Sequence, residues 1–400
     1  MAGEETEASK STGVWGGGLG VIYLSVFVSL FSFAAMPAFV GAYIDFRGVD
    51  IADAGRIASA EAIAQAIGCA IATALLSRAG VNLRRVVLIG LLLQGAAQVI
   101  SALAGDNAAF ILARCVSGFC CSVVYVAASV YIASLKNPDR PYAIYFGILF
   151  ATGSLGLLVL PFLFAQAGLN GVYLIYAALL ALSGWFVGRY PKYALRKESG
   201  KSGARASLFS GLLRPSVIIL LLALFLSFVC NGGVWTYAER IGLQTGASSE
   251  RLGLALALAM GAGLIGTLIV SILGNRIGRL APIVVNLVLL TGAMGWLYLG
   301  PGLLGFFGAA TLFNIASAAV TPYVLAALAM WDSTGRAAVV GTFTYILGWA
   351  LGPGVISFTL ADARFTTAFI LAGAGFMISA LLTVIAFALQ GSSKAEVLNG

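Results

Sequence analysis

The sequence predicts an all-α integral membrane protein whose twelve transmembrane helices form two pseudo-symmetric six-helix bundles. Its composition is the first reason: 60% of the residues are apolar and only 10% are charged, whereas a soluble domain carries about 25% charged residues. The second reason is the recurrence of apolar segments about twenty residues long, each able to cross a hydrocarbon core about 30 Å thick as a helix. The third is an internal repeat that relates the two halves of the chain. So few charged residues could not cover a water-facing surface.

The apolar segments define twelve expected spans, six on either side of a polar stretch near the middle of the chain. The first six are 17–44, 53–76, 84–104, 108–134, 142–165 and 170–188. The last six are 215–238, 250–273, 280–300, 302–330, 337–360 and 365–389. The expected organisation is a tail (1–16), an N-terminal bundle (17–188), a basic linker (189–214), a C-terminal bundle (215–389) and a second tail (390–400).

The lysine and arginine residues predict the orientation in the membrane, because cytoplasmic loops carry an excess of them. With the N-terminus inside, seventeen of them fall in inner segments and five in outer segments. We therefore expect a multi-pass protein of the plasma (bacterial inner) membrane with both termini in the cytoplasm. The net charge of +8 then reflects cytoplasmic loops and not nucleic-acid binding. The acidic, polar start of the chain is expected to be a solvated tail and not a signal peptide.

The residue types argue against several other classes of protein. The chain has no histidine, which removes the commonest metal ligand and the usual proton relay near neutral pH. A transported proton would therefore have to bind a carboxylate. The five cysteines all fall in apolar spans and are expected to be buried hydrophobic residues, not a disulfide framework or a metal site. No polar segment is long enough for a folded enzymatic or nucleotide-binding domain, so we expect neither enzymatic activity nor a cofactor.

The two halves share motifs at corresponding places. The motif "SRAGVNLRR" (77–85) follows the second span, and "GNRIGR" (274–279) follows the eighth, about half the chain later. Likewise "NPDRPYAIYFG" (137–147) opens the fifth span, and "DSTGRAAVVG" (332–341) opens the eleventh. Internal duplication of this kind is typical of a transporter whose halves move around a site at the membrane midplane.

These features resemble the major facilitator superfamily, and the resemblance covers essentially the whole chain. That family carries a loop signature, roughly G-x-L-A-D-R-x-G-R-R, after spans two and eight. The segment "SILGNRIGRL" (271–280) matches it, with Asn275 where the family usually has aspartate. The first copy, "ALLSRAGVNLRRV" (74–86), matches less well, with Ser77 or Asn82 near the position where the family has its acidic residue. The family's fourth-span signature, R-x-x-x-G, is present as residues 114 to 118.

The resemblance implies that these loops latch the cytoplasmic side. Because the acid is missing from both copies, we expect a latch of neutral hydrogen bonds. The residues expected to act in gating, including a pair at the end of span ten that would staple helix ends, are Ser77, Arg78, Arg84, Arg85, Asn275, Arg276, Gly278, Arg279, Asp332 and Arg336. The family's export signature, a G-P step with paired glycines in span five, is absent there. A similar element, "GWALGPG" (348–354), occurs in span eleven.

Two charged residues stand inside expected spans of the first half. At about 1.5 Å per residue, Arg114 lies roughly 9 Å in from Ala108 in span four, and Glu61 roughly 12 Å in from Asp53 in span two. Both spans start on the outer side, so the two residues lie at similar depth. An arginine within the bilayer normally faces a cavity or a partner. We therefore expect a pair, direct or water-bridged, facing the central cavity, with Gln65 one turn further on.

Two roles for the pair are open. Glu61 could be the protonatable group, with Arg114 tuning its affinity for the proton or binding an anionic substrate. Alternatively, the two residues form a buried ion pair that holds the helices in register.

Further candidates lie in the second half. The end of span seven, "CNGGVWTYAER" (230–240), could contact a substrate through its polar and aromatic side chains, or anchor the helix at the membrane interface. The motifs of the first half recur about half the chain later, and the same shift from Arg114 leads close to Asn314. The expected cavity residues of this half are Asn231, Trp235, Tyr237, Glu239, Asn314 and Tyr345.

The sequence therefore predicts a secondary active transporter of a small organic solute, aromatic or an organic acid, coupled to protons and working by alternating access. The expected partners are the solute and the lipid bilayer, with no nucleic acid, and the protein is expected to be monomeric. A proton-driven efflux pump for lipophilic compounds is the alternative. A non-transporting receptor or scaffold on the same fold is the more distant one, because a scaffold gains nothing from a buried titratable pair.

Overall fold

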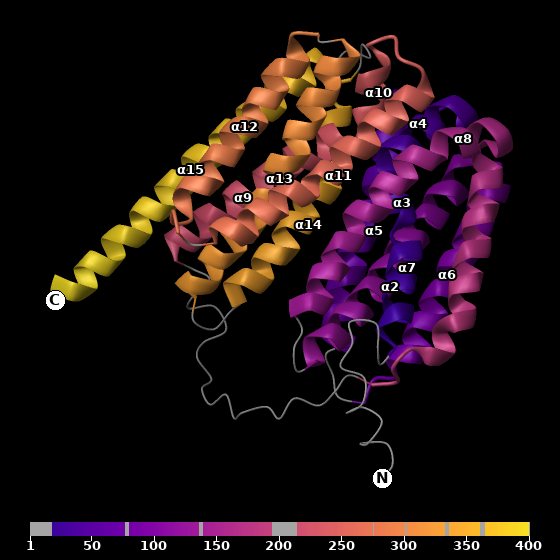
Figure 1. Ribbon diagram of the computed structural model, residues 1–400, viewed down its shortest axis with the longest axis horizontal. Coiled ribbons are helices and arrows are strands. Elements are labelled where there is room, and N and C mark those ends of the chain that lie inside the picture. Colours follow the sequence, from indigo (N-terminus) through magenta and orange to yellow (C-terminus); the bar gives the residue numbers. More distant parts are fainter. Residues whose placement is uncertain are drawn as a thin grey trace. The chain divides into compact units, whose positions relative to one another are not determined.

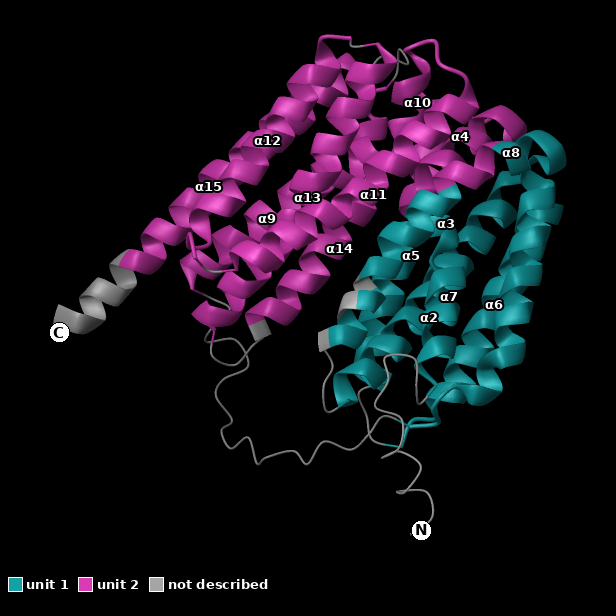
Figure 2. Ribbon diagram, viewed as in Figure 1, with its two compact units in different colours: residues 1–35, 60–156, 162–201 teal, residues 36–59, 157–161, 202–400 magenta. Residues whose placement is uncertain are grey.

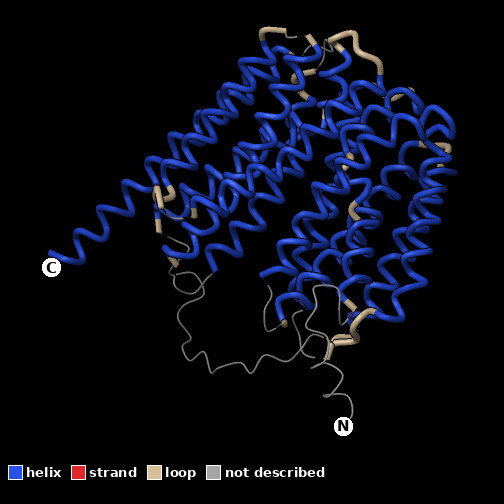
Figure 3. The backbone as a smooth tube through the Cα atoms, viewed as in Figure 1, coloured by secondary structure: helices blue, strands red, loops and turns tan. Residues whose placement is uncertain are grey.

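The computed structural model describes residues 18–76, 80–135, 139–193, 214–274, 276–300, 302–332, 336–360 and 365–399. Within these ranges the chain is helical, and Figure 3 shows helices joined by short loops without a strand. The predicted fold class, an all-α membrane protein, is confirmed.

Ten helices of the described residues are long and apolar enough to cross a membrane. In the first half they are α5 (Ile51–Leu76), α6 (Leu83–Leu103), α7 (Asn107–Ser134) and α8 (Asp139–Phe186). In the second half they are α9 (Pro215–Thr236), α11 (Ser249–Leu273), α12 (Leu280–Tyr298), α13 (Leu303–Trp331), α14 (Arg336–Ser357) and α15 (Thr366–Asn399). Two short elements follow α8 and α9, the 3₁₀ helix η1 (Val187–Arg189) and α10 (Ala238–Leu243).

Two interruptions account for the remaining predicted spans. Gly168 breaks α8 with φ 61° and ψ −178°, a left-handed φ that glycine adopts readily, so α8 contains the fifth and sixth spans. The first span is divided into α2 (Leu19–Ser29), α3 (Phe31–Ala34) and α4 (Met36–Arg47). Pro37 lies just after the second division and has no N–H to donate to the preceding turn. Together these helices cover all twelve predicted spans.

The chain forms two compact units, coloured separately in Figure 2. Unit 1 comprises residues 1–35, 60–156 and 162–201, and unit 2 comprises 36–59, 157–161 and 202–400. Within unit 1, α6 and α7 pack side by side, and α2 contacts both (Figure 1). Within unit 2, α9 packs against α14 and α15, α11 against α13, and α12 against α13 and α15.

Helix α6 shows how these helices distribute their side chains. Its polar residues Gln94, Gln98 and Ser101 are fully buried, while Leu93 and Leu103 are 51% and 75% exposed. A soluble helix would turn its polar side chains outward. The reverse arrangement is expected where the surroundings are hydrocarbon and polar groups need partners inside the protein.

Glycines allow α9 and α14 to approach to backbone contact. A Cβ at Gly232 would overlap the backbone of Trp349, and a Cβ at Gly352 would overlap the backbone around Gly233. Small residues at a helix interface permit this kind of packing within a membrane. The "GWALGPG" element of span eleven therefore has a packing role in unit 2.

Candidate functional site

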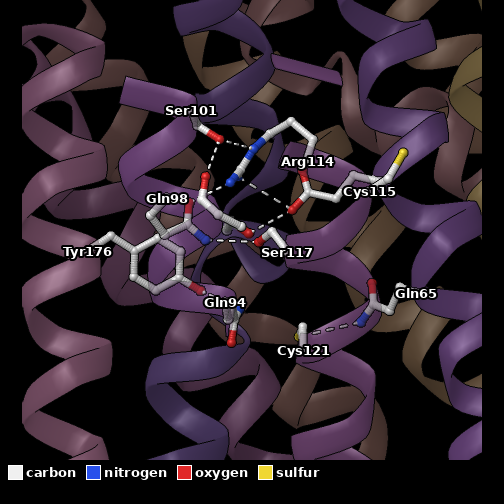
Figure 4. A network of polar contacts seen from close by, with 12 residues as sticks. Gln65, Gln94, Gln98, Ser101, Arg114, Cys115, Ser117, Cys121 and Tyr176 are labelled. Carbon is white, nitrogen blue, oxygen red and sulfur yellow. Dashed lines mark hydrogen bonds and ion pairs between the residues drawn. The ribbon is translucent and has the colours of Figure 1, made fainter. Parts of the chain in front are cut away.

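A network of buried polar side chains in unit 1 surrounds Arg114, which lies about two turns into α7 (Figure 4). The side chain of Arg114 is 0% exposed. Nε donates to Ser101 Oγ at 3.1 Å, and one terminal nitrogen donates to Gln98 Oε1 at 2.5 Å. The guanidinium carbon also lies 4.6 Å from the ring centre of Tyr173, within the range of a cation–π contact.

The predicted pairing of Glu61 with Arg114 is present in the structure. Oε1 of Glu61 lies 3.7 Å from the other terminal nitrogen of Arg114 and accepts a hydrogen bond of 3.0 Å from Ser32 Oγ on α3. The second oxygen, Oε2, is buried and accepts no hydrogen bond from the described residues. Oε1 therefore makes both the ion pair and the hydrogen bond, and Oε2 is the oxygen at which this carboxylate could accept a proton.

The pair does not face an open, water-filled cavity as expected from the sequence, since Glu61 is only 2% exposed and Arg114 is fully covered. The reason is the neighbouring helix: α6 places Gln98 and Ser101 against Arg114, in the space that a water-filled cavity would occupy. Because isolated charges are very costly to bury, such a pair requires this complement of hydrogen bonds.

A second layer of the network was not predicted. Gln98 Nε2 donates to Ser117 Oγ at 2.9 Å. One turn away, Gln94 Nε2 donates to the backbone oxygen of Ser29 at 2.9 Å and to Tyr176 Oη at 3.1 Å. The signal was present in the sequence, since positions 94, 98 and 101 share one face of a helix.

Gln65 lies one turn beyond Glu61, as expected, but has a separate contact: its amide nitrogen lies 3.8 Å from the sulfur of Cys121. Cys115 likewise directs its thiol to the backbone oxygen of Ala60 at 3.6 Å. All five cysteines are free thiols; Cys120, Cys121 and Cys230 are buried as expected, while Cys69 and Cys115 are half-buried.

Gly118 brings α7 into backbone contact with α5 beside the ion pair, because a Cβ at this position would overlap the backbone oxygen of Glu61. We expect Gly118→Ala to lower the free energy of unfolding by about 1–3 kcal/mol, since a backbone oxygen cannot move aside as a side chain can. Gly147→Ala on α8 is the matched control, with open space around its Cβ. The control should be neutral or stabilise by up to about 1 kcal/mol. Thermal unfolding in detergent measures both, and equal effects would contradict the contact.

The candidates of the second half lie in unit 2 without forming one cluster. Asn231 donates through its amide nitrogen to Ser317 Oγ on α13. Trp235 stacks on Phe313, with ring centres 6.2 Å apart and an angle of 9° between the rings. These contacts link α9 to α13, and both Asn231 and Trp235 are buried.

Other candidates are occupied by local contacts. Asn314 donates to the Ala310 backbone oxygen of its own helix at 2.9 Å, and the ring of Tyr345 lies 5.2 Å from that of Phe228. Tyr237 Oη donates to the Pro353 backbone oxygen at 3.3 Å. The side chain of Glu239 pairs with Arg240, its neighbour on α10.

The predicted gating residues are described in part. Ser77, Arg78, Asn275 and the side chain of Arg336 lie outside the described residues. Arg84 Nε donates to the Tyr190 backbone oxygen at 2.7 Å, while Arg85 is exposed.

Helix caps occur at both predicted latch regions. The side chain of Asn82 accepts from the Arg85 backbone N–H at 3.1 Å and caps α6. Asp332 accepts from the Ala337 backbone N–H at 3.0 Å near the start of α14, which is the helix-end contact expected of it.

The second copy of the loop motif follows α11. Arg276 and Gly278 are exposed, and Gly278 has a left-handed φ of 72°. Arg279 contacts the sulfur of Met330, near the C-terminal end of α13. Arg84 and Arg279 thus contact a backbone oxygen and a sulfur, and the neutral latch stays a prediction.

Comparisons with known proteins identify relatives of this chain. A family model described as the Major Facilitator Superfamily matches residues 22–330. A solved structure titled "Crystal structure of D-xylose-proton symporter" is similar, with a TM-score of 0.73 and 16% sequence identity, over 91% of this chain and 96% of that chain. At this identity the likeness shows the fold. A comparison with curated proteins gave no match.

Proposed function

Because this chain belongs to the major facilitator superfamily, we propose that it is a secondary active transporter that couples the movement of a small organic solute to a proton. Membership of the family indicates a transporter. The proton coupling, the class of solute and the location in a bacterial inner membrane with cytoplasmic termini are our proposals.

The single observation that carries the proton coupling is the geometry of Glu61. Its carboxylate is buried in a membrane-spanning helix, with Oε1 beside Arg114 and Oε2 without a hydrogen-bond partner among the described residues. Ionisable groups at membrane depth are costly and typically mark ion or proton pathways. Since the chain has no histidine, this carboxylate is the most suitable proton carrier in the first half. The similar fold of a D-xylose–proton symporter also supports this proposal.

Alternating access gives the buried pair a function. In the conformation described here Arg114 and Glu61 are covered, so a rearrangement must expose Glu61 for a proton to enter or leave. Arg114 stays charged throughout because its guanidinium does not lose a proton. It would stabilise the ionised carboxylate after the proton departs, or receive the anionic group of an organic-acid solute.

The buried polar groups favour coupled transport over a scaffold. A scaffold could fill the same space with apolar side chains at no loss of stability. The glycines of the span-eleven element pack α14 onto α9, so they give no separate support to an export role.

The test of this function begins with a thermal-shift screen of the purified protein against sugars, organic acids and aromatic solutes at two pH values. Solutes that stabilise the protein are then tested for uptake into proteoliposomes with an imposed proton gradient. We expect accumulation above the equilibrium level when the gradient is present and equilibration without it. Equal uptake under both conditions, for every solute that binds, would contradict proton coupling.

A further inference from the structure

Unit 2 contains a second group of charged side chains, at the end of the helices where α4 meets α10. Arg240 of α10 donates from one terminal nitrogen to the Asp45 carboxylate at 2.5 Å and to the Gly41 backbone oxygen, both on α4. Nε of Arg240 lies 2.9 Å from Oε2 of Glu239. One guanidinium is thus shared between two carboxylates, which come from the first and second halves of the chain.

Glu239 is the buried member of this group. Its side chain is 16% exposed, compared with 52% for Asp45. The carboxylate lies directly against Gly41, and a Cβ at that position would overlap it. Glu239 can therefore occupy this place only while α4 and α10 remain in contact.

Two uncharged contacts in unit 2 join neighbouring elements, namely α5, α14 and Tyr237. Ser59 Oγ, on α5, accepts from the Gly354 backbone N–H of α14 at 2.6 Å. Tyr237, next to α10, bonds to Pro353 and packs closely on Gly55. Neither of these contacts contains a carboxylate or joins α4 to α10, so the charged group is the part of the α4–α10 contact most suited to respond to a proton.

We propose that Glu239 is a second protonation site, and that a proton bound there holds α4 against α10 and keeps this end of the transporter closed. The inference rests on the proposed proton-coupled function and adds the step by which a proton controls access. With Glu239 neutral, Arg240 and Asp45 balance each other. With Glu239 ionised, the group carries an excess negative charge in a place with little water, which favours separation of the two helices.

The electrostatics of Glu239 support this assignment. Burial raises the pKa of its carboxyl to about 7, although Arg240 lowers it and Asp45 raises it to lesser degrees. The other elements packed on α10 are α9, α11 and α13. Helices α9 and α13 carry no charged residue, α11 carries the exposed Glu250 and Arg251, and α4 also carries Arg47.

The direction of the pH effect follows from linkage. In an open state Glu239 would be hydrated, with a pKa near its ordinary value of 4.5. The closed contact has the higher pKa, so it binds the proton more tightly and is stabilised by it. This stabilisation is complete below the open-state pKa and is lost as the pH rises through about 7. Alkaline pH should therefore open this end, and acid should close it.

The experiment measures labelling of Ala42→Cys, a buried position on α4 next to Gly41, by a charged, membrane-impermeant maleimide without added solute. Rates are taken at pH about 5 and about 8.5, on either side of the raised pKa. Peptide mapping separates position 42 from the native cysteines. Gln244→Cys, an exposed site that follows α10, supplies the pH dependence of the thiol reaction itself.

After division by the rate at Gln244→Cys, labelling at position 42 should rise at least about tenfold from acid to alkaline pH, which corresponds to one unit of pKa difference. Glu239→Gln should remain slowly labelled at both pH values, and Gly41→Ala, which displaces the carboxylate, should be labelled rapidly at both. The rise in labelling rate from acid to alkaline pH is the labelling step. Absence of this step in the otherwise native protein, or a full step in Glu239→Gln, would overturn the proposal.

Labelling and uptake together distinguish a failure of the Glu239 proposal from a failure of proton-coupled transport. Glu61→Gln should retain the labelling step, because Glu61 belongs to unit 1 and takes no part in this contact. A missing step together with gradient-driven uptake would reject the role of Glu239 alone. A preserved step without gradient-driven uptake would reject proton-coupled transport while leaving Glu239 as a pH-sensitive closure.

Discussion

Replacing Arg114 with leucine is expected to lower the free energy of unfolding by about 3–5 kcal/mol, the usual cost of removing one partner from a buried ion pair. The loss would leave the carboxylate of Glu61 uncompensated in the interior of unit 1 and the acceptors Gln98 and Ser101 without their donor. Thermal or denaturant-induced unfolding of the purified protein in detergent measures the effect.

Two comparison variants separate charge from packing. Arg85→Leu removes an exposed arginine and should change stability by no more than about 0.5 kcal/mol. Combining Arg114→Leu with Glu61→Gln should recover part of the loss, because no charge remains buried alone. If the double variant is as unstable as the sum of the two single variants, the pair interaction contributes nothing and the interpretation of Arg114 is wrong.

Glu61→Gln is expected to abolish accumulation of the solute against its gradient while leaving exchange across the membrane intact. Glutamine keeps the size of the side chain and can still accept a hydrogen bond from Ser32, but it cannot bind and release a proton. A carrier without its proton site can equilibrate its solute but cannot concentrate it. Proteoliposome uptake with an inward proton gradient, compared with solute exchange in the same vesicles, measures the two activities separately.

Loss of both accumulation and exchange in Glu61→Gln would point to a damaged fold, and the unfolding curve of the variant checks for that. Gln65 supplies the matched control, because it lies one turn away on the same helix but contacts Cys121 and not Arg114. Gln65→Ala should retain accumulation. Undiminished accumulation by Glu61→Gln would contradict the role proposed for this carboxylate.

The fold and the central pair could be predicted from local properties of the sequence. Span positions follow from hydropathy, and the gap expected between residues 165 and 170 contains the break at Gly168. The pairing of Glu61 with Arg114 followed from their depth, because the rise of a helix fixes how far each side chain lies from its end. Such properties need no knowledge of which helices are neighbours.

The surroundings of the pair could not be predicted in the same way, because they depend on the direction in which each helix turns its faces. Gln94 and Gln98 look like minor interruptions in an apolar span, yet Gln94 bonds to Tyr176 of α8 and Gln98 bonds to Arg114 of α7. Tyr237 is the opposite case, a residue that the sequence favoured as a solute contact. Its aromatic ring and hydroxyl suggested solute binding, while the structure packs the ring on Gly55 and directs the hydroxyl to Pro353.

A pH-induced infrared difference spectrum of the purified protein tests most directly whether Glu61 takes up the proton. Acidification should produce the carbonyl stretch of a protonated carboxyl group in a water-poor environment, and this band should be absent from Glu61→Gln while it persists in Glu239→Gln. If the spectrum of Glu61→Gln keeps every carboxyl band of the unmodified protein, Glu61 binds no proton and the proposed coupling is contradicted.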